Sequence, residues 1–277
     1  MIDPRILDQQ IDHFLREDIG MVDLTSTIMV DEETVAAFNM TAREEIMLSG
    51  VGVAARVFSR YSETVEFKAL QQDGSRIQAG NVIATVSGPA RDILTAERTA
   101  LNLIQHMSGI ATATNQYVEL IRGTKAQLLD TRKTTPGLRA LEKHAVECGG
   151  GRNHRLSLDS GVLVKDNHIA VCGSLTAAIK RAKSRVPVLT KVEVECDTLE
   201  QVEEALNAGA DMLLLDNMDN DTLRQAVARV KGRIPLEASG GINLETIRSI
   251  AQTGVDFISV GRITQSSPSV DIGLDEA

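Results

Sequence analysis

The sequence predicts an α/β protein, with an incomplete α/β barrel preceded by an N-terminal α+β domain. Three observations carry this prediction. Strand-like and helix-like patterns alternate regularly through the second half of the 277-residue chain. A polar residue or a glycine ends each of four successive predicted strands. Roughly the first hundred residues lack this rhythm, which indicates a separate domain of another class.

The alternation is clearest between residues 188 and 260. Apolar runs at residues 188–196, 212–215, 234–238 and 255–260 predict strands, and amphipathic stretches at 198–208, 221–230 and 244–253 predict helices. Two shorter apolar runs, at 127–129 and 161–164, predict earlier strands of the same sheet. Strand–helix units with short connections specify parallel strands joined by right-handed crossovers, in an open sheet or in a barrel.

The spacing of the strand ends favours the barrel. Residues Glu195, Asp216, Ser239 and Gly261 lie at or just after the ends of predicted strands and are 21, 23 and 22 positions apart. Such residues would line one mouth, where the active sites of barrel enzymes lie. A barrel that begins near residue 110 has about 155 residues, against ~250 in a complete eight-stranded barrel. Because only six strands are recognisable, we expect the barrel to be incomplete.

The N-terminal region mixes a helical start with short strand-like stretches at residues 35–41, 64–69 and 82–86, separated by turn signals such as Asp73-Gly74. A long helical pattern begins after Pro89 and is expected to connect the domains. We therefore predict an α+β domain over residues 1–109, with residues 268–277 as a candidate addition to it. The barrel domain is predicted over residues 110–267.

Composition excludes several classes of function. The chain has 29 basic and 38 acidic residues, a net charge of −9, no Trp, two Tyr and five Phe, which speaks against binding of nucleic acid. No apolar signal-peptide region and no membrane-length apolar run is present, so we expect a cytoplasmic protein that does not bind membranes. The three cysteines are widely spaced and lack a CxxC pair, so we expect reduced, mostly buried thiols and neither a disulfide scaffold nor a structural zinc site.

Basic residues concentrate in one region of this acidic chain. Between Arg132 and His168 lie three of the five histidines and seven Lys or Arg residues, which are Arg132, Lys133, Arg139, Lys143, Arg152, Arg155 and Lys165. Glycines are interleaved with them in the stretches at 130–137 and 149–155. This pattern predicts a pocket for a small, multiply charged anion, centred on Arg132, Lys133, His154, Arg155 and Lys165. The alternative is a solvated surface paired with nearby acidic residues.

Three further features fit such a pocket. The segment Ser239-Gly240-Gly241 follows a strand and precedes a predicted helix, and with Gly261 it predicts a phosphate site; a tight turn is the alternative. Carboxylates at Glu195 and Asp216 are suited to Mg²⁺, to sugar hydroxyls or to developing positive charge, although they could also form ion pairs at the rim. Arg98, at the margin of an apolar helix stripe, could extend to water or hold an anion across a domain or subunit boundary.

The chain resembles the quinolinate phosphoribosyltransferase family over nearly its whole length. The most specific matches are the segments 130–137, 149–155, 163–169, 192–195, 214–217, 237–242 and 258–261, and the segments 17–20, 23–26 and 97–102 are similar too. The resemblance implies an open-sandwich N-terminal domain and a seven-stranded incomplete barrel. It also implies a homodimer or a higher homo-oligomer, in which the N-terminal domain of one subunit covers the barrel mouth of its partner.

The resemblance assigns roles to the residues named above. Arg132, His154, Arg155 and Lys165 would hold the carboxylates of quinolinate, with Arg98 contributed by the partner subunit. Lys133 would lie near the pyrophosphate or the substrate anion, and Glu195 and Asp216 would contact Mg²⁺ and the ribose of phosphoribosyl pyrophosphate. Its 5-phosphate would lie on Ser239, Gly240, Gly241 and Gly261. The implied catalytic residues are Lys133, Lys165, Glu195 and Asp216, and the implied reaction forms nicotinate mononucleotide, pyrophosphate and CO₂ in de novo NAD biosynthesis.

Three alternatives stay open at this point. A molybdenum-associated branch of the family shares the Asp-Thr-Arg-Lys segment, although Arg155 and the segment at 165–168 favour the quinolinate branch. A barrel lyase would use Lys165 or Lys191 as a Schiff-base amine. A regulator that binds phosphoribosyl compounds without turnover is the third.

Overall fold

The computed structural model describes residues 2–277, which form two compact units. The first unit comprises the residues up to Asn115 together with Thr135–Gly150 and Thr264–Ala277, and the second comprises Gln116–Thr134 and Gly151–Ile263. The predicted domain boundary, between residues 109 and 110, falls within one continuous helix, α4 (Ala90–Leu120).

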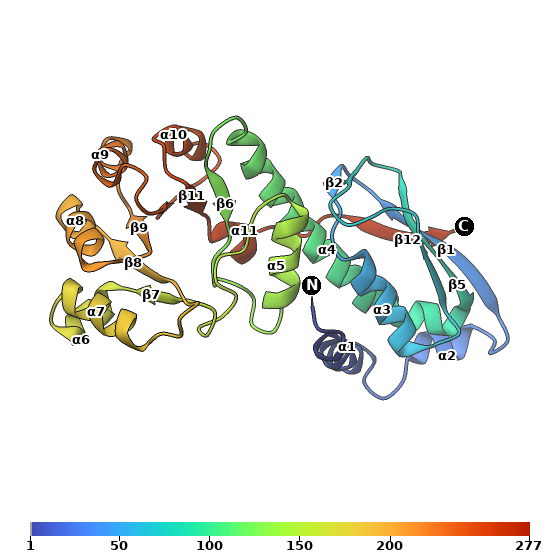
Figure 1. Cartoon of the computed structure of the whole chain (residues 1–277). Coiled ribbons are helices and arrows are strands. Elements are labelled where there is room, and N and C mark those ends of the chain that lie inside the picture. Colours follow the sequence, from blue (N-terminus) through green and yellow to red (C-terminus); the bar gives the residue numbers. More distant parts are fainter. Residues whose placement is uncertain (1) are drawn as a thin grey trace. The chain divides into compact units, whose positions relative to one another are not determined.

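The first unit contains a four-stranded antiparallel sheet in the order β12-β1-β5-β3. Its strands are β1 (Val35–Ala42), β3 (Glu66–Ala69), β5 (Val82–Pro89) and β12 (Ile272–Glu276), and the short strands β2 (Ile46–Met47) and β4 (Arg76–Ile77) pair separately. The last strand pairs with β1, from Ala42 opposite Ile272 to Phe38 opposite Glu276. The end of the chain therefore completes the first sheet (Figure 1).

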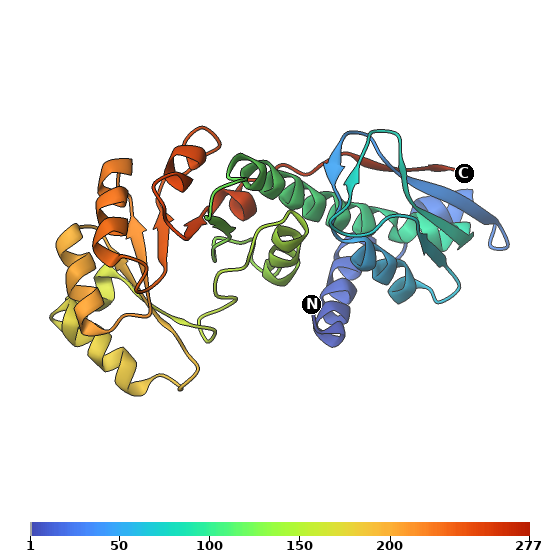
Figure 2. The ribbon, with the colours of Figure 1, turned by 45° about the horizontal axis from the view of Figure 1, so that its top comes forward.

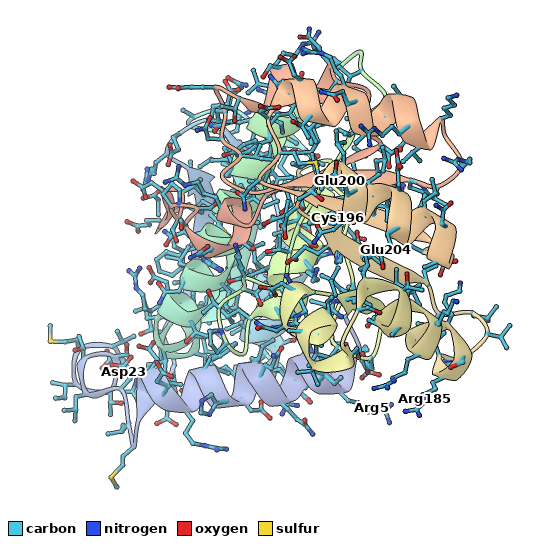
Figure 3. All side chains as sticks on the ribbon, turned by 90° about the vertical axis from the view of Figure 1, so that its left-hand side faces the viewer. Arg5, Asp23, Arg185, Cys196, Glu200 and Glu204 are labelled. Atoms are coloured by element: carbon cyan, nitrogen blue, oxygen red, sulfur yellow. The ribbon has the colours of Figure 1, made fainter. Side chains whose placement is uncertain are left out.

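Helices α1 (Pro4–Ile19), α2 (Leu24–Met29), α3 (Val51–Tyr61) and α5 (Arg139–Cys148) accompany this sheet. Helix α3 buries the apolar face that contains Val57 and Phe58, and the Phe58 ring stacks on Phe67 of β3 with 6.0 Å between the ring centroids. Asp23, labelled in Figure 3, caps α2 by accepting a hydrogen bond from the Ser26 amide at 3.0 Å.

The second unit contains a six-stranded parallel sheet in the order β6-β11-β10-β9-β8-β7. The strands are β6 (Gln127–Leu129), β7 (Val162–Val164), β8 (Val192–Cys196), β9 (Met212–Asp216), β10 (Leu236–Ser239) and β11 (Phe257–Ser259). The helices are α6 (Asp166–Cys172), α7 (Leu175–Arg185), α8 (Leu199–Ala208), α9 (Asn220–Val230), α10 (Ile247–Ala251) and α11 (Arg262–Gln265), the last of which runs on into the first unit. Figure 2 shows α7, α8 and α9 together on the outer side of the strands.

This sheet confirms the predicted α/β class and its incomplete barrel. The chain order after β7 is a regular strand–helix alternation, and the strands run parallel throughout. The family resemblance implied seven strands; the sheet has six among residues 2–277, and beyond β6 a single parallel bridge joins Leu129 to Arg152. Within residues 2–277, no ladder joins β7 to β6, so the sheet does not close.

Two predicted elements begin three or more residues later in the structure than the sequence predicted. The strand expected at 188–196 begins only at Val192, because Val188 and Leu189 are fully or almost fully exposed in a turn that follows Pro187. The helix expected at 244–253 begins only at Ile247, because the side chains of Asn243 and Thr246 accept the backbone hydrogen bonds of the preceding turn. Cys148 and Cys172 are half-buried, so the expectation of mostly buried thiols holds only for Cys196.

Cys196 ends β8, and Glu200 and Glu204 lie on the helix that follows it (Figure 3). Burial raises the pKa of the Cys196 thiol to about 12, with smaller contributions from nearby carboxylates. This thiol is therefore a core side chain and not a nucleophile. In the described part of the chain, no helix combines the length and the apolar character needed to cross a bilayer.

Candidate active site

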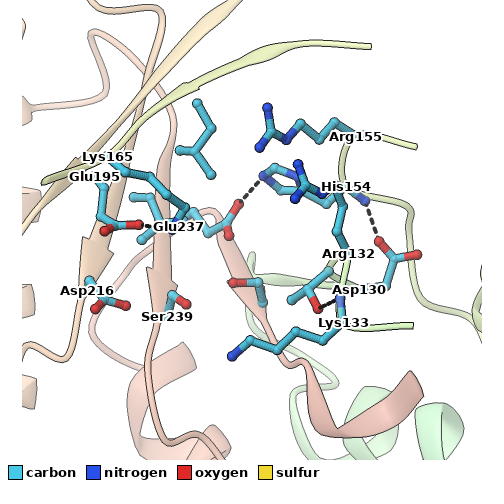
Figure 4. Close-up of a pocket in the computed structure, with 14 residues that line it drawn as sticks. Asp130, Arg132, Lys133, His154, Arg155, Lys165, Glu195, Asp216, Glu237 and Ser239 are labelled. Carbon is cyan, nitrogen blue, oxygen red and sulfur yellow. Dashed lines mark hydrogen bonds and ion pairs between the residues drawn. The ribbon is translucent and has the colours of Figure 1, made fainter. Parts of the chain in front are cut away.

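The second unit contains a cavity of about 370 Å³ at the carboxyl ends of its parallel strands. Its lining includes eight of the residues that the sequence predicted, which are Arg132, Lys133, His154, Arg155, Lys165, Glu195, Asp216 and Ser239. Figure 4 shows these side chains converging on one space. The carboxyl end of a parallel barrel is where the active sites of such folds lie.

One wall of the cavity consists of cations from two loops. Arg132 and Lys133 follow β6, and His154 and Arg155 follow the bridge residue Arg152. The fully buried Asp130 ties the loops together, because its carboxylate accepts a hydrogen bond from the His154 amide at 2.8 Å. These contacts hold the side chains of both loops on the same side of the cavity (Figure 4).

The guanidinium groups of this wall are suited to an anion. Nη1 of Arg132 is buried and has no hydrogen-bond partner among residues 2–277, which leaves a donor for a ligand. Arg155 donates from Nη1 to the Gly161 carbonyl at 2.9 Å, which fixes the direction of its side chain. Burial, and secondarily the charge of Arg132, lowers the pKa of Arg155 from its usual value. A bound anion would relieve both effects.

The opposite wall carries carboxylates from adjacent strands. Glu195 lies near the end of β8 and Asp216 at the end of β9. Nζ of Lys165, just beyond β7, pairs with Oε2 of Glu195 at 2.5 Å. Asn217 donates from Nδ2 to Oδ2 of Asp216 at 2.6 Å, from a left-handed backbone conformation with φ of 54°. Asparagine tolerates this conformation, so the turn after β9 both ends the strand and orients its terminal carboxylate.

These carboxylates fit a Mg²⁺ ion. The ion takes oxygen ligands and is commonly held by one or two carboxylates, while water and substrate phosphates complete its octahedron. Glu195 and Asp216 offer that donor set on neighbouring strands, at the edge of a cavity with room for a phosphorylated ligand.

The glycine loop after β10 has backbone conformations that favour glycine, and residue 240 has no room for a side chain. Gly240 and Gly241 have φ of 101° and 61°, and a Cβ atom on Gly240 would lie 2.1 Å from Oδ1 of Asn217. Ser239 lines the cavity, whereas the two glycines lie just beyond it in the chain. The prediction that this segment opens a helix is wrong, because α10 starts only at Ile247.

Gly261 lies in the neighbouring loop after β11. A Cβ atom there would meet the Lys133 side chain at 2.8 Å, so glycine permits Lys133 to extend past this loop. Any phosphate on these two loops would therefore be held by loop amides and Lys133, and not by the end of a long helix.

Sequence reasoning missed two buried acidic residues, Glu193 and Glu237, of which Glu237 lines the cavity. Their residues are 6% and 1% exposed, and they lie one pleat deeper than Glu195 and Ser239 on the same strand faces. Oε2 of Glu193 lies 2.8 Å from Nε2 of His154, and Oε2 of Glu237 lies 3.5 Å from it. Burial, and secondarily Glu193, raises the pKa of Glu237 to about 8. A signal for both residues was present in the sequence, because each is a carboxylate inside an otherwise largely apolar strand.

Arg98 does not line this cavity. It is exposed on α4 in the first unit and borders a hollow of about 330 Å³, which Asp18, Asp23, Leu94 and Thr95 also line. Its predicted contribution from a partner subunit stays a prediction.

Comparisons with known proteins agree with this geometry. The family models for the N-terminal and C-terminal domains of quinolinate phosphoribosyl transferase match residues 23–108 and 110–275. A probable carboxylating nicotinate-nucleotide pyrophosphorylase of Bacillus subtilis is 44% identical over 269 residues, covering 97% of this chain and 93% of that protein. The carboxylating nicotinate-nucleotide pyrophosphorylase of Mycobacterium leprae is 45% identical over 267 residues, covering 94% of each.

The solved structure of a nicotinate-nucleotide pyrophosphorylase from Francisella tularensis superposes with a TM-score of 0.96 at 39% identity, covering 100% of this chain and 98% of that one. Because the family models and these relatives together span both units, the chain belongs to the quinolinate phosphoribosyl transferase family.

Proposed function

We propose that the chain catalyses carboxylating phosphoribosyl transfer from phosphoribosyl pyrophosphate to quinolinate, as a step of de novo NAD biosynthesis. The products are nicotinate mononucleotide, pyrophosphate and CO₂. The observation that carries this proposal is the meeting of a cationic wall and a pair of carboxylates in one cavity, in a chain of this family. Two polyanionic substrates need the cations, and the sugar that passes between them needs the carboxylates.

Quinolinate lies against the cationic wall in this proposal. Arg132, His154, Arg155 and Lys165 bind its two carboxylates, and the buried Nη1 of Arg132 gains the acceptor that it lacks among residues 2–277. Nε2 of His154 contacts the carboxylates of Glu193 and Glu237, so the orientation of the imidazole ring is fixed before substrate binds. Preset orientation lowers the entropy lost when the substrate is positioned.

Phosphoribosyl pyrophosphate lies along the opposite wall. Ser239, Gly240, Gly241 and Gly261 hold its 5-phosphate through loop amides, and Glu195 and Asp216 contact the ribose hydroxyls. These two carboxylates would also hold Mg²⁺, which supplies charge neutralisation for the pyrophosphate when it is bound.

In the transfer step, the pyridine nitrogen forms a bond to C1 of the ribose while the bond from C1 to the pyrophosphate oxygen breaks. Glu195 and Asp216 stabilise the positive charge that develops on the sugar, and Lys133 stabilises the negative charge of the departing pyrophosphate. The 2-carboxylate then leaves as CO₂, and its bonding electrons remain on the ring carbon beside the cationic nitrogen. A proton from Lys165 or from water completes the product.

We further propose that the protein works as a homodimer or a higher homo-oligomer in which Arg98 serves the partner subunit. Support comes from an exposed apolar cluster around α2, where Met21, Val22, Leu24, Ile28 and Met29 are each at least half exposed. Val22 and Leu24 also line the hollow that Arg98 borders. Clusters of this kind commonly mark interfaces between proteins. The cytoplasmic location stays a prediction.

The first test is incubation of purified protein with quinolinate, phosphoribosyl pyrophosphate and Mg²⁺, with nicotinate as a parallel substrate. Nicotinate mononucleotide and CO₂ should form from quinolinate only. Formation from nicotinate alone would reject the carboxylating reaction. Binding of phosphoribosyl pyrophosphate without turnover of either substrate would point to the molybdenum-associated branch or to a regulator.

Subunit complementation tests the role of Arg98. Variants Arg98→Ala and Lys165→Ala should each be nearly inactive, and unfolding and refolding them together should give hybrid dimers with one intact site. Random pairing in a two-fold dimer predicts recovery of about a quarter of wild-type activity. If Arg98 instead serves its own subunit, every site in every mixture carries a defect and no activity returns.

A further inference from the structure

A second group of chemically competent side chains lies in the first unit, outside everything that the proposed reaction uses. It consists of Asp73 in the turn between β3 and β4, with His144 and Cys148 on α5. His144 and Cys148 are four residues apart, so they share one face of the helix. One ligand atom of each of the three residues lies within 4.8 Å of the others.

The contacts within this group are short and specific. Oδ2 of Asp73 lies 2.9 Å from Nε2 of His144, and Sγ of Cys148 lies 3.5 Å from the same nitrogen. The other carboxylate oxygen of Asp73 accepts hydrogen bonds from the amides of Gly50 and Val51, at 2.9 Å and 3.0 Å. The Asp73 carboxylate is therefore held from behind by the start of α3, as the carboxylate ligands of metal ions commonly are.

The arrangement does not fit nucleophilic catalysis by the thiol. In a catalytic triad, the nucleophile and the carboxylate contact different nitrogens of the imidazole, so that one positions the ring while the other exchanges a proton. Here both contact Nε2. Instead, the three potential ligand atoms lie close together, as ligands do around a metal ion.

We propose that Asp73, His144 and Cys148 form a binding site for Zn²⁺ or a similar borderline-soft divalent ion, with water as the fourth ligand. Bond lengths of about 2.0 to 2.3 Å in a tetrahedral site place neighbouring donor atoms about 3.4 Å apart. The separation of 3.5 Å between Cys148 and His144 already meets this requirement, and the 2.9 Å between His144 and Asp73 needs to open by about half an ångström. A mixed sulfur, nitrogen and oxygen set selects zinc over magnesium or calcium.

The competitor of the ion is a proton. The hydrogen bond that His144 donates to the Asp73 carboxylate, and then its contact with Cys148, raises the pKa of His144 to about 10. Metal binding displaces this proton from the imidazole. An ion pair without metal is thus the alternative state of the same residues.

A metal ion bound at this site would link the carboxyl end of α5 to the turn that contains Asp73. Cys148 precedes the Gly149-Gly150-Gly151 segment, and Arg152, Asn153 and His154 follow this segment in the chain. An ion at Cys148 would fix one end of this glycine segment.

The test uses the full-length, metal-free protein titrated with Co²⁺ and then with Zn²⁺. One Co²⁺ per chain should bind with a thiolate-to-cobalt charge-transfer band, and Zn²⁺ should abolish the band by displacement. Cys148→Ser should lose the band and weaken Zn²⁺ binding at least about tenfold. Cys172→Ser removes the other half-buried thiol, which lies in the second unit, and should retain the band.

A measurement on the wild-type chain covers the case in which Cys148→Ser does not fold. Zn²⁺ should protect Cys148 from alkylation in preference to Cys172, as read by mass spectrometry of the peptides. The absence of a charge-transfer band together with unprotected Cys148 overturns the proposal, as does a band that depends on Cys172. Neither result bears on the transferase activity, which uses none of these three residues.

Discussion

Replacement of Glu237 by Gln should make the fold progressively more stable than wild type as the pH rises. Glu237 lines the cavity but is only 1% exposed, and its pKa rises from 4.5 to about 8. Between these values the folded protein keeps a proton that the unfolded chain releases, so the wild-type fold loses stability as pH rises through this window. Glutamine is neutral throughout and suffers no such loss.

The rise from 4.5 to about 8 corresponds to about 5 kcal/mol as an upper limit, at 1.36 kcal/mol per pH unit. Because relaxation of the surroundings and entry of water reduce the cost of burying a charge, about half of this value is expected. Urea unfolding of both proteins at about pH 5 and pH 8 measures the difference. Glu203→Gln, at a side chain 58% exposed, supplies the surface control. A difference that stays constant with pH would refute the reasoning, because Glu237 would then be ionised in the fold.

Three further predictions concern other sites. Glu195→Gln keeps the shape of the side chain but removes its charge, and should lower kcat by about 10² to 10³ with little change in thermal stability; unchanged steady-state turnover would remove Glu195 from the reaction. Gly240→Ala should raise the KM for phosphoribosyl pyrophosphate and lower the Tm. The reason is that the new Cβ would lie 2.1 Å from Oδ1 of Asn217 and 2.8 Å from the backbone nitrogen of Asn217. Its control Gly232→Ala, at φ of 70° with nothing within 4 Å, should cost only about 1 kcal/mol of backbone strain; equal losses in both would argue against a crowded phosphate loop. His144 has a pKa raised from 6.5 to about 10, so its ion pair with Asp73 contributes stability below pH 6.5 that is lost as pH rises through about 10. Asp73→Asn should therefore lower the Tm at pH 7 more than at pH 10, and the reverse order in differential scanning calorimetry would contradict it.

Local periodicity predicted the parallel sheet because buried parallel strands are continuous apolar runs. The strands at 127–129 and 212–215 match β6 and β9 within one residue. The same rule predicted too early a start for β8. Val188 and Leu189 are apolar but lie exposed in a turn after Pro187. Apolar character alone does not distinguish these cases.

The site was predicted from two signals, the concentration of basic residues between Arg132 and His168 and the polar residues at strand ends. Glu195, Asp216 and Ser239 were found by the second of these signals, and all three line the cavity. Glu193 and Glu237 were missed because the rule reads the last residue of a strand and not the pleat below it. The Asp73 group was missed because its members are 71 and 75 positions apart in sequence, and only the pairing of a turn with a helix brings them together.

Because β12 pairs with β1, the first sheet is begun early in synthesis but completed late. β1 ends at Ala42, and its partner begins only at Ile272. Until residues 272–276 have been synthesised, the first sheet of the nascent chain has an open edge, although all six strands of the parallel sheet precede these residues in the chain. Contacts of such long sequence separation form late and slowly, and an exposed strand edge is a template for pairing with another chain. The first sheet is thus completed only after the strands of the parallel sheet have been synthesised, and chaperone dependence should concentrate in the first unit.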